Sequence, residues 1–85
     1  MQGYYNYSSW NSWNVAMCIN STFGLFALSL QWSEEVIKGR NTLEEAVDGL
    51  LDLIHHYYKD GKTPDGAFFD RESCKEWLLN NHFED

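Results

Sequence analysis

Charge divides this chain into two parts. Residues 1–33 contain no Asp, Glu, Lys, Arg or His, whereas all 13 acidic and all 6 basic residues lie in residues 34–85. No Pro-, Ser- or Gly-rich linker separates the two parts, and a chain of 85 residues is long enough for one hydrophobic core. We therefore predict a single domain over residues 1–85, in which a neutral half packs against an acidic half.

The clearest helix pattern lies in the charged half. Thr42 and Glu45 match a capping box, in which each side chain accepts a hydrogen bond from a backbone amide at the start of the helix. Apolar residues recur every three or four positions after them. We predict a helix over residues 42–59, which Asp60 and Gly61 end.

The remainder of the charged half predicts a turn and one more helix. Residues 63–66 read Thr-Pro-Asp-Gly, a sequence typical of turns. Asp70 is placed to cap a helix over residues 70–82. Because no stretch of four residues alternates as a strand would, we predict an all-α fold, a single small domain of three to four short helices.

Capping residues also predict how the neutral half begins. Residues 1–11 form an aromatic segment, and Ser12 is a suitable N-cap for a short helix that reaches Asn20. The Asn-Ser-Thr run at residues 20–22 favours a break after that helix. One continuous helix over residues 12–38 is the competing interpretation.

A second helix in the neutral half is expected from Phe23 to Lys38, with Gly39 as its C-terminal stop. Its apolar residues surround more than one face, so we expect burial on more than one side. The residues that follow helical spacing are Phe23, Phe26, Ala27, Leu30, Val36 and Ile37, and those that widen the stripe are Leu25, Leu28 and Trp32.

The neutral half argues against export and against membrane insertion. A secretory signal needs a basic region before its apolar stretch, and residues 1–33 carry none. The apolar segment over residues 15–32 lacks flanking basic residues and contains Asn20, Ser21, Thr22, Ser29 and Gln31. We expect a cytoplasmic protein without a membrane partner.

The two cysteines, Cys18 and Cys74, lie far apart in sequence and form no Cys-x-x-Cys pair. We expect two buried or free thiols in a reducing cytosol. A disulfide between the first and last segments is the alternative.

Ionisable residues give no pattern of catalysis. Asp52 and His56 are four residues apart and could face one metal ion, but the adjacent His55 points about 100° away around the helix. The residues that could complete such a site are Glu72, Cys74 and His82. With no activated nucleophile and no phosphate-binding loop, we predict no metal, no cofactor and no enzyme activity.

Aromatic residues are numerous in the neutral half, as in proteins that bind single-stranded nucleic acid. Such proteins combine stacking rings with a basic groove. Residues 1–33 contain no Lys or Arg and the chain has a net charge of −7, so phosphate contact would be repulsive. We expect no direct nucleic-acid binding.

Acidic residues form a second pattern. Glu44, Asp48 and Asp52 recur every four residues and make a stripe about 12 Å long on the helix face opposite the core. Carboxylates about 6 Å apart resemble the phosphates of a nucleic-acid strand, and such a surface attracts basic partners. The candidate partner-binding residues are Glu44, Glu45, Asp48 and Asp52, with Glu34 and Glu35 as secondary contacts. A solvated face that maintains solubility is the alternative interpretation.

The run SWNVAMCINS, residues 12–21, resembles a signature near the N-terminus of a family of small, largely uncharacterised bacteriophage and plasmid proteins. That signature has the form Asn-Tyr-x-Thr-Trp-Asn-Val-Ala-Leu-x-Ile-Asn-Asn, and the matching residues are Trp13, Asn14, Val15, Ala16, Ile19 and Asn20. The chain departs from it at Cys18, where an aromatic residue is common, and at Ser21. The resemblance implies no catalytic residue. It implies a mobile genetic element, whose small acidic proteins often bind and antagonise host proteins, and therefore a location in the cytoplasm of the bacterial host.

Two functions follow from these observations. The first is a phage-type accessory protein that binds and inhibits a host defence or regulatory protein, presenting its carboxylates to a basic nucleic-acid-binding surface. The second is a structural or oligomeric interaction module that uses its N-terminal aromatic surface, because Tyr and Trp frequently anchor protein interfaces. The candidate anchors are Tyr4, Tyr5, Tyr7 and Trp10. A homo-oligomer is compatible with the second function.

Overall fold

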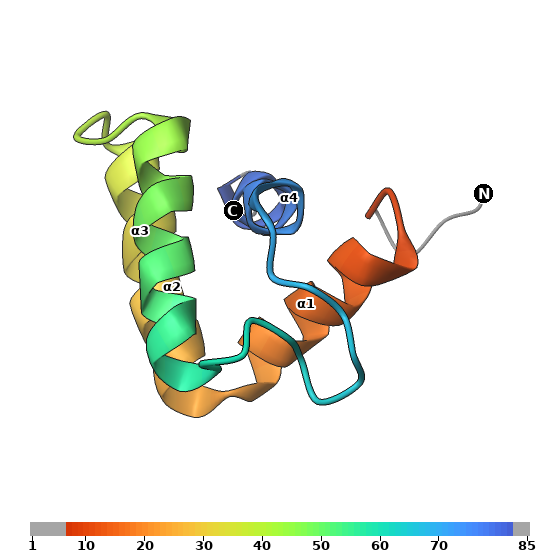
Figure 1. Ribbon diagram of the computed structural model, residues 1–85. Coiled ribbons are helices and arrows are strands. Elements are labelled where there is room, and N and C mark those ends of the chain that lie inside the picture. Colours follow the sequence, from red (N-terminus) through yellow and green to blue (C-terminus); the bar gives the residue numbers. More distant parts are fainter. Residues whose placement is uncertain (1–6, 83–85) are drawn as a thin grey trace.

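The computed structural model describes residues 7–82, with the side chains of residues 7–80 (Figure 1). Its helices are α1 (Trp10–Ser21), α2 (Phe23–Ile37), α3 (Leu43–Tyr57) and α4 (Arg71–His82). Residues 7–82 contain no strand, only an isolated β-bridge between Lys62 and Phe68. The prediction of a small all-α fold is confirmed.

α2 and α3 lie side by side as a hairpin, and α1 leaves the start of α2 at a steep angle (Figure 1). α4 contacts each of the other three helices, so it closes the core between the hairpin and α1. The buried apolar residues come from every helix and from the loop before α4; they are Val15, Ala16, Cys18, Ile19, Leu25, Ala46, Val47, Leu50, Ile54, Ala67, Phe69, Cys74, Trp77 and Leu78.

α1 begins earlier than expected. Ser9 is the N-cap, because its side chain accepts a hydrogen bond from the Ser12 backbone amide at 3.1 Å. Ser12 is instead buried in the first turn, where its hydroxyl donates to a carboxylate oxygen of Glu76 at 3.3 Å. The prediction that Ser12 caps this helix is therefore wrong, because a contact with α4 occupies its side chain.

The break between α1 and α2 lies at Thr22. This residue is extended, and its hydroxyl donates to the backbone oxygen of Cys18 at 2.9 Å. The two helices are bent by 108°, which confirms the predicted break and shows that a continuous helix over residues 12–38 is wrong. Within residues 7–82, no single helix reaches the length and apolarity of a membrane span; α1 and α2 meet those criteria only when taken together across their bend.

α2 ends as predicted, but it buries a different face. Lys38 is the C-cap, and Gly39 follows with a φ of 78°, a left-handed conformation that glycine adopts without strain. The fully buried positions of α2 are Leu25, Ser29 and Ser33. The expectation of burial on more than one side is wrong: Phe23 is 89% exposed, and Leu28, Leu30 and Ile37 are also exposed.

α3 starts with the predicted capping box. The Thr42 hydroxyl accepts from the Glu45 amide at 3.1 Å, and a Glu45 carboxylate oxygen accepts from the Thr42 amide at 2.9 Å. The helix ends at Tyr57, two residues before the predicted end. Tyr58 leaves the helical conformation, and its ring stacks on Phe69 with the centroids 5.4 Å apart.

The segment before α4 forms the predicted turn and cap. The Gly66 amide donates to the Thr63 backbone oxygen at 2.9 Å, and Gly66 has a φ of 96°. A carboxylate oxygen of Asp70 accepts from the Ser73 amide at 2.9 Å, which caps the start of α4. This segment also places Ala67 in the core.

Candidate binding surfaces

The predicted acidic stripe on α3 lies beside α4. The Arg71 guanidinium donates to Asp48 through Nη1 and to Glu44 through Nη2, the latter at 2.6 Å. Lys75 lies 3.9 Å from the second carboxylate oxygen of Glu44. The hydrogen bonds to Asp48 and Glu44 raise the pKa of Arg71. We call these four residues (Glu44, Asp48, Arg71 and Lys75) the α3–α4 charge cluster.

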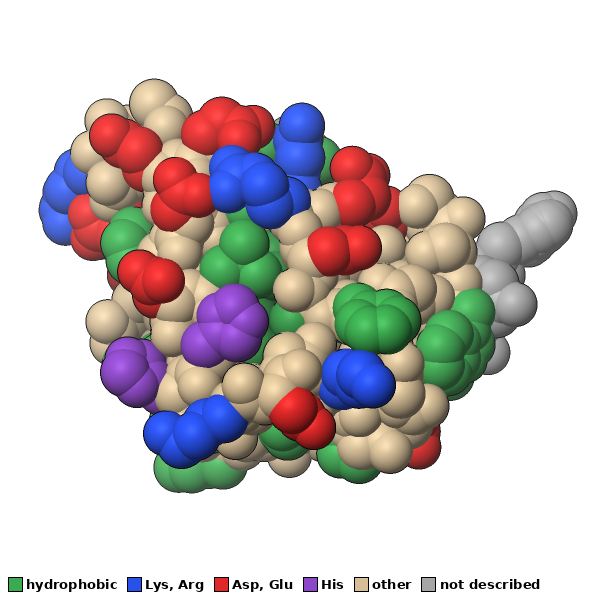
Figure 2. Space-filling model, viewed as in Figure 1, with side chains coloured by type: hydrophobic (Ala, Val, Ile, Leu, Met, Phe, Trp, Pro, Cys, Tyr) green, Lys and Arg blue, Asp and Glu red, His purple; other side chains and the backbone are tan. Residues whose placement is uncertain are grey.

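This cluster contains as many cationic as anionic side chains. Figure 2 accordingly shows acidic and basic side chains intermixed over this side of the molecule, without a continuous acidic surface. Arg71 is 27 residues from Glu44 and 23 from Asp48, so helical spacing within α3 gave no sign of the pairing.

The other predicted partner-binding acids also have mostly internal contacts. A carboxylate oxygen of Glu34 lies 3.8 Å from Nζ of Lys38, and a carboxylate oxygen of Glu35 lies 3.0 Å from Nη1 of Arg40. Glu45 belongs to the capping box, where the hydrogen bond from the Thr42 backbone amide is the main cause of its lowered pKa. Among the predicted acids, Asp52 is exposed and has neither an ion pair nor a hydrogen bond within the described residues.

A groove of about 410 Å³ lies between Tyr7 and α1. Its lining is mainly apolar and consists of Tyr7, Trp13, Ala16, Met17 and Asn20. We call it the aromatic groove. The spacing of its four α1 residues places them on one face of that helix, which is the signal that could have identified it.

Of the two predicted aromatic anchors that the structure describes, one lines the groove and the other does not. Tyr7 lines it and is half-buried, and burial, followed by the nearby charge of Glu76, raises the pKa of its hydroxyl. Trp10 is exposed but does not line the groove. Tyr4 and Tyr5 lie outside the described residues.

Asparagine side chains hold the groove's helix in place. Asn20 accepts from the Trp77 indole at 2.9 Å. Asn14 donates to Asp65 at 3.1 Å and accepts from the Thr63 hydroxyl at 2.6 Å. Both asparagines therefore join α1 to residues about fifty positions away along the chain.

Asn11 makes the same kind of long-range contact. Its side chain donates to the Phe68 backbone oxygen at 2.9 Å and accepts from the Phe68 amide at 2.7 Å. Amide side chains therefore fix the loop before α4 against α1 at two points.

The cysteines are free and buried, as expected. Burial raises the pKa of the Cys74 thiol to about 12, so this thiol stays protonated and is a poor nucleophile at neutral pH. Cys18 lies beside Tyr58, whose pKa is raised mainly by the hydrogen bond between them.

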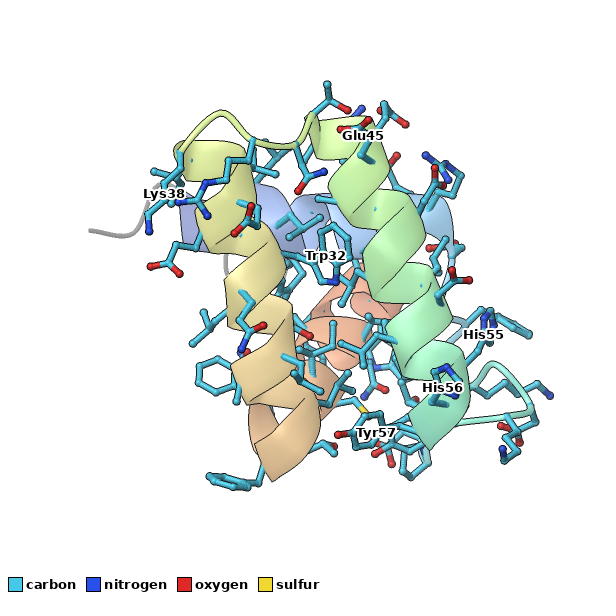
Figure 3. All side chains as sticks on the ribbon, turned by 90° about the vertical axis from the view of Figure 1, so that its left-hand side faces the viewer. Trp32, Lys38, Glu45, His55, His56 and Tyr57 are labelled. Carbon is cyan, nitrogen blue, oxygen red and sulfur yellow. The ribbon has the colours of Figure 1, made fainter. Side chains whose placement is uncertain are left out.

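The histidines that the sequence singled out lie on the outside of α3. His55 and His56 are exposed and project in different directions (Figure 3). The described part of the chain has no group of three or more His, Cys, Asp or Glu side chains that could hold a metal ion. The His82 side chain lies outside the described side chains.

The chain matches no family model, and no curated protein or solved structure is significantly similar to it.

Proposed function

We propose that this chain is a small binding protein that holds an apolar side chain of another protein in the aromatic groove. The observation that supports this most directly is the groove itself: about 410 Å³ of mainly apolar space at the surface. Pockets of this size and composition are typical of binding sites in proteins.

The chemistry of the lining favours a protein partner. Tyr, Trp and Met are enriched at protein interfaces, because they bury a large area for little loss of conformational freedom. The Met17 thioether is flexible and adapts to the shape of an incoming side chain. The side-chain oxygen of Asn20 accepts a hydrogen bond from Trp77. Its amide nitrogen has no hydrogen-bond partner among residues 7–80, so it is available to donate to a backbone carbonyl of the partner.

Charge supports the groove over the acidic stripe. In the α3–α4 charge cluster, Arg71 and Lys75 already offset Glu44 and Asp48. A basic partner would have to displace these cations before it met the carboxylates. The groove requires no such exchange, because residues 7–33 carry no charge.

The identity of the partner follows from the resemblance of residues 12–21 to phage and plasmid proteins. In that setting the partner is a bacterial host protein, a defence or regulatory factor, and binding inhibits it. The groove itself supports the binding; the host setting rests on the resemblance.

The substitution Met17→Glu tests the groove, because Met17 is half exposed and its replacement leaves the core intact. Phe68→Glu is the matched control: the same charge at a similarly exposed apolar position outside the groove. The wild-type protein and both variants are used in parallel to purify partners from lysate of a bacterial host. We expect Met17→Glu to weaken the interaction by about 2 kcal/mol, roughly thirty-fold in Kd.

Retention of the same partner by the wild type and Phe68→Glu, together with its loss from Met17→Glu, supports the proposal. Equal retention by all three proteins contradicts it.

Asp52 favours a second candidate function, the acidic mimic of a nucleic-acid strand. It is exposed and pairs with no cation among residues 7–80, so it is available to a basic partner. In that case Asp52→Lys weakens partner binding, whereas Arg71→Gln strengthens it by releasing Glu44 and Asp48. Binding through the groove predicts no effect of either substitution, so the pair separates the two functions.

A further inference from the structure

The outer side of α2 carries apolar residues with the spacing of a coiled-coil seam. Phe23, Ala27, Leu30, Glu34 and Ile37 follow one another at steps of four, three, four and three residues. This is the heptad pattern by which two helices pack along each other. Glu34 is the one charged residue among the five.

All five side chains are exposed, Phe23 at 89% and Ile37 at 54%. The opposite side of α2 faces the protein, where Leu25 and Ser29 are buried. Figure 3 shows Trp32 lying between α2 and α3, whereas Lys38 points outward from α2, away from α3. The five residues therefore form a helix face that no other described part of the chain covers, and we call it the α2 seam.

We propose that the α2 seam pairs with the α2 seam of a second copy of this chain, in antiparallel orientation about a two-fold axis. This is independent of the aromatic groove and goes beyond the proposed function. A two-fold dimer uses the same surface on both copies, so the surface must be complementary to itself.

Charge selects a second copy as the occupant. The chain has a net charge of −7, so two copies repel each other through most approaches. α2 is neutral from Phe23 to Ser33, and at the far end of the seam Lys38 lies 3.8 Å from Glu34. The seam is thus a surface on which two copies can meet without opposing acids.

Charge also selects the orientation. In a parallel pair, Glu34 would lie against Glu34 of the second copy. In an antiparallel pair, each Glu34 lies beside the neutral part of the other helix, and each Lys38 lies towards the second copy's Phe23, where its ammonium group meets an aromatic ring.

The length of the seam sets the strength of the dimer. It spans 15 residues from Phe23 to Ile37, about 21 Å at the rise of an α-helix. This is short for a permanent interface, which is typically larger and more hydrophobic. We expect monomer and dimer to exchange, with the dimer population rising with protein concentration.

Sedimentation velocity up to about 1 mM protein tests the pairing, a range that covers weak dimers. We expect the wild type to move from monomer mass to dimer mass, and Leu30→Glu to remain a monomer with unchanged helical circular dichroism. The matched control is Phe68→Glu, which places the same charge at another exposed apolar residue, in the loop before α4, and should dimerise as the wild type does. Phe23→Gln, a milder change in the seam, replaces Leu30→Glu if that variant unfolds.

A wild type that stays monomeric at the highest concentration overturns the proposal, as does a seam variant that dimerises normally. Flotation of a monomeric wild type with phosphatidylcholine vesicles would also overturn it, because the seam would then face lipid. Met17→Glu should dimerise fully, so failure of the groove and failure of the seam are distinguishable.

Disulfide cross-linking tests the orientation. Gln31 flanks the seam beside Leu30, its middle residue, so Gln31→Cys should form a covalent dimer in air. In an antiparallel pair the two copies of residue 38 lie about 20 Å apart, so Lys38→Cys should not. The native Cys18 and Cys74 are buried and do not compete. Equal cross-linking of both variants, or of neither, overturns the antiparallel arrangement.

Discussion

The neutral half and the charged half of this protein use their polar side chains in opposite ways. In α1, Asn14 and Asn20 form internal hydrogen bonds that hold distant segments together, while Met17 is left at the surface. In α3 and α4, apolar residues fill the core and charged residues pair with each other at the surface, as Arg71 does with Glu44.

This difference has an energetic meaning. A buried hydrogen bond that loses one partner leaves a desolvated polar group, whereas the members of a broken surface ion pair are hydrated by water. Replacing a buried polar residue of the neutral half should therefore lower stability, whereas replacing a charged surface residue of the charged half should change stability little. The aromatic groove lies in the neutral half, and the α2 seam begins there and extends into the charged half at Glu34.

The largest expected effect is at the residue that joins the two halves. Trp77 of α4 is fully buried, donates to Asn20 of α1 and packs edge-to-face on Phe26 of α2. Trp77→Ala should lower the free energy of unfolding by about 3–5 kcal/mol. Urea denaturation followed by circular dichroism measures this. Trp77→Phe keeps a ring and should lose less; a cost below about 1 kcal/mol for the Ala variant would show that α1 and α4 are not held by this residue.

The next effect sharpens the comparison directly. Asn14→Ala removes the acceptor of the buried Thr63 hydroxyl and the donor to Asp65, which should cost about 1–3 kcal/mol in the same denaturation experiment. Asn41→Ala is the control, because the Asn41 side chain donates its hydrogen bond to Glu45 at an exposed site. If Asn41→Ala costs as much as Asn14→Ala, the contrast between internal and surface polar groups fails.

The capping box of α3 should contribute less. Thr42→Ala should lower the free energy of unfolding by about 1 kcal/mol. The pKa of Glu45 is lowered in the folded protein, so its contribution is complete above the ordinary glutamate pKa and is lost as the pH falls through the folded value. The stability difference between wild type and Glu45→Gln should therefore shrink on acidification, which a pH series of thermal melts measures. A difference that grows at low pH would contradict this assignment.

Ser29 should give a smaller effect of the opposite sign. It is fully buried in α2, and its Oγ has no hydrogen-bond partner among the described side chains. Ser29→Ala removes an unsatisfied polar atom and adds helix propensity, so it should raise the free energy of unfolding by about 0.5–1 kcal/mol. Loss of stability in this variant would indicate that the hydroxyl is satisfied in solution.

The smallest effect is expected for the charged half. Arg71→Gln breaks two exposed ion pairs, so the denaturation midpoint should shift less than in Asn14→Ala. The remaining difference from wild type should vanish in about 1 M salt, which screens exposed charges. A shift as large as that of Asn14→Ala, or one that persists in salt, would mean that the α3–α4 charge cluster holds the two helices together.

Features set by neighbouring residues could be predicted from the sequence. The capping box of α3, the break near Thr22 and the cap at Asp70 all depend on contacts within a few residues, and each was predicted at its position. The start of α1 was not, because Ser9 and Ser12 are both suitable caps and a contact between Ser12 and Glu76 decides between them.

The surfaces were harder to predict because they too depend on contacts between residues that are far apart in sequence. α2 has apolar residues all around it, so spacing alone did not reveal that Ser29 and Ser33 face the protein while Phe23 faces solvent. The α3–α4 charge cluster depends on how α4 lies against α3, which no periodicity within one helix records. The spacing of Trp13, Met17 and Asn20 predicts that they share one helix face. The groove, however, also needs Tyr7 beside that face, which the spacing does not predict.

The contact between the first and last helices also affects when the chain can fold during its synthesis. Asn20 and Trp77 are 57 residues apart, so α1 leaves the ribosome long before α4 can cover it. Until then the apolar residues of the neutral half, which lack any charge to keep chains apart, are exposed to other nascent chains. Premature termination before Trp77 would leave them exposed permanently, so truncated products of this chain should aggregate rather than accumulate as partly folded monomers.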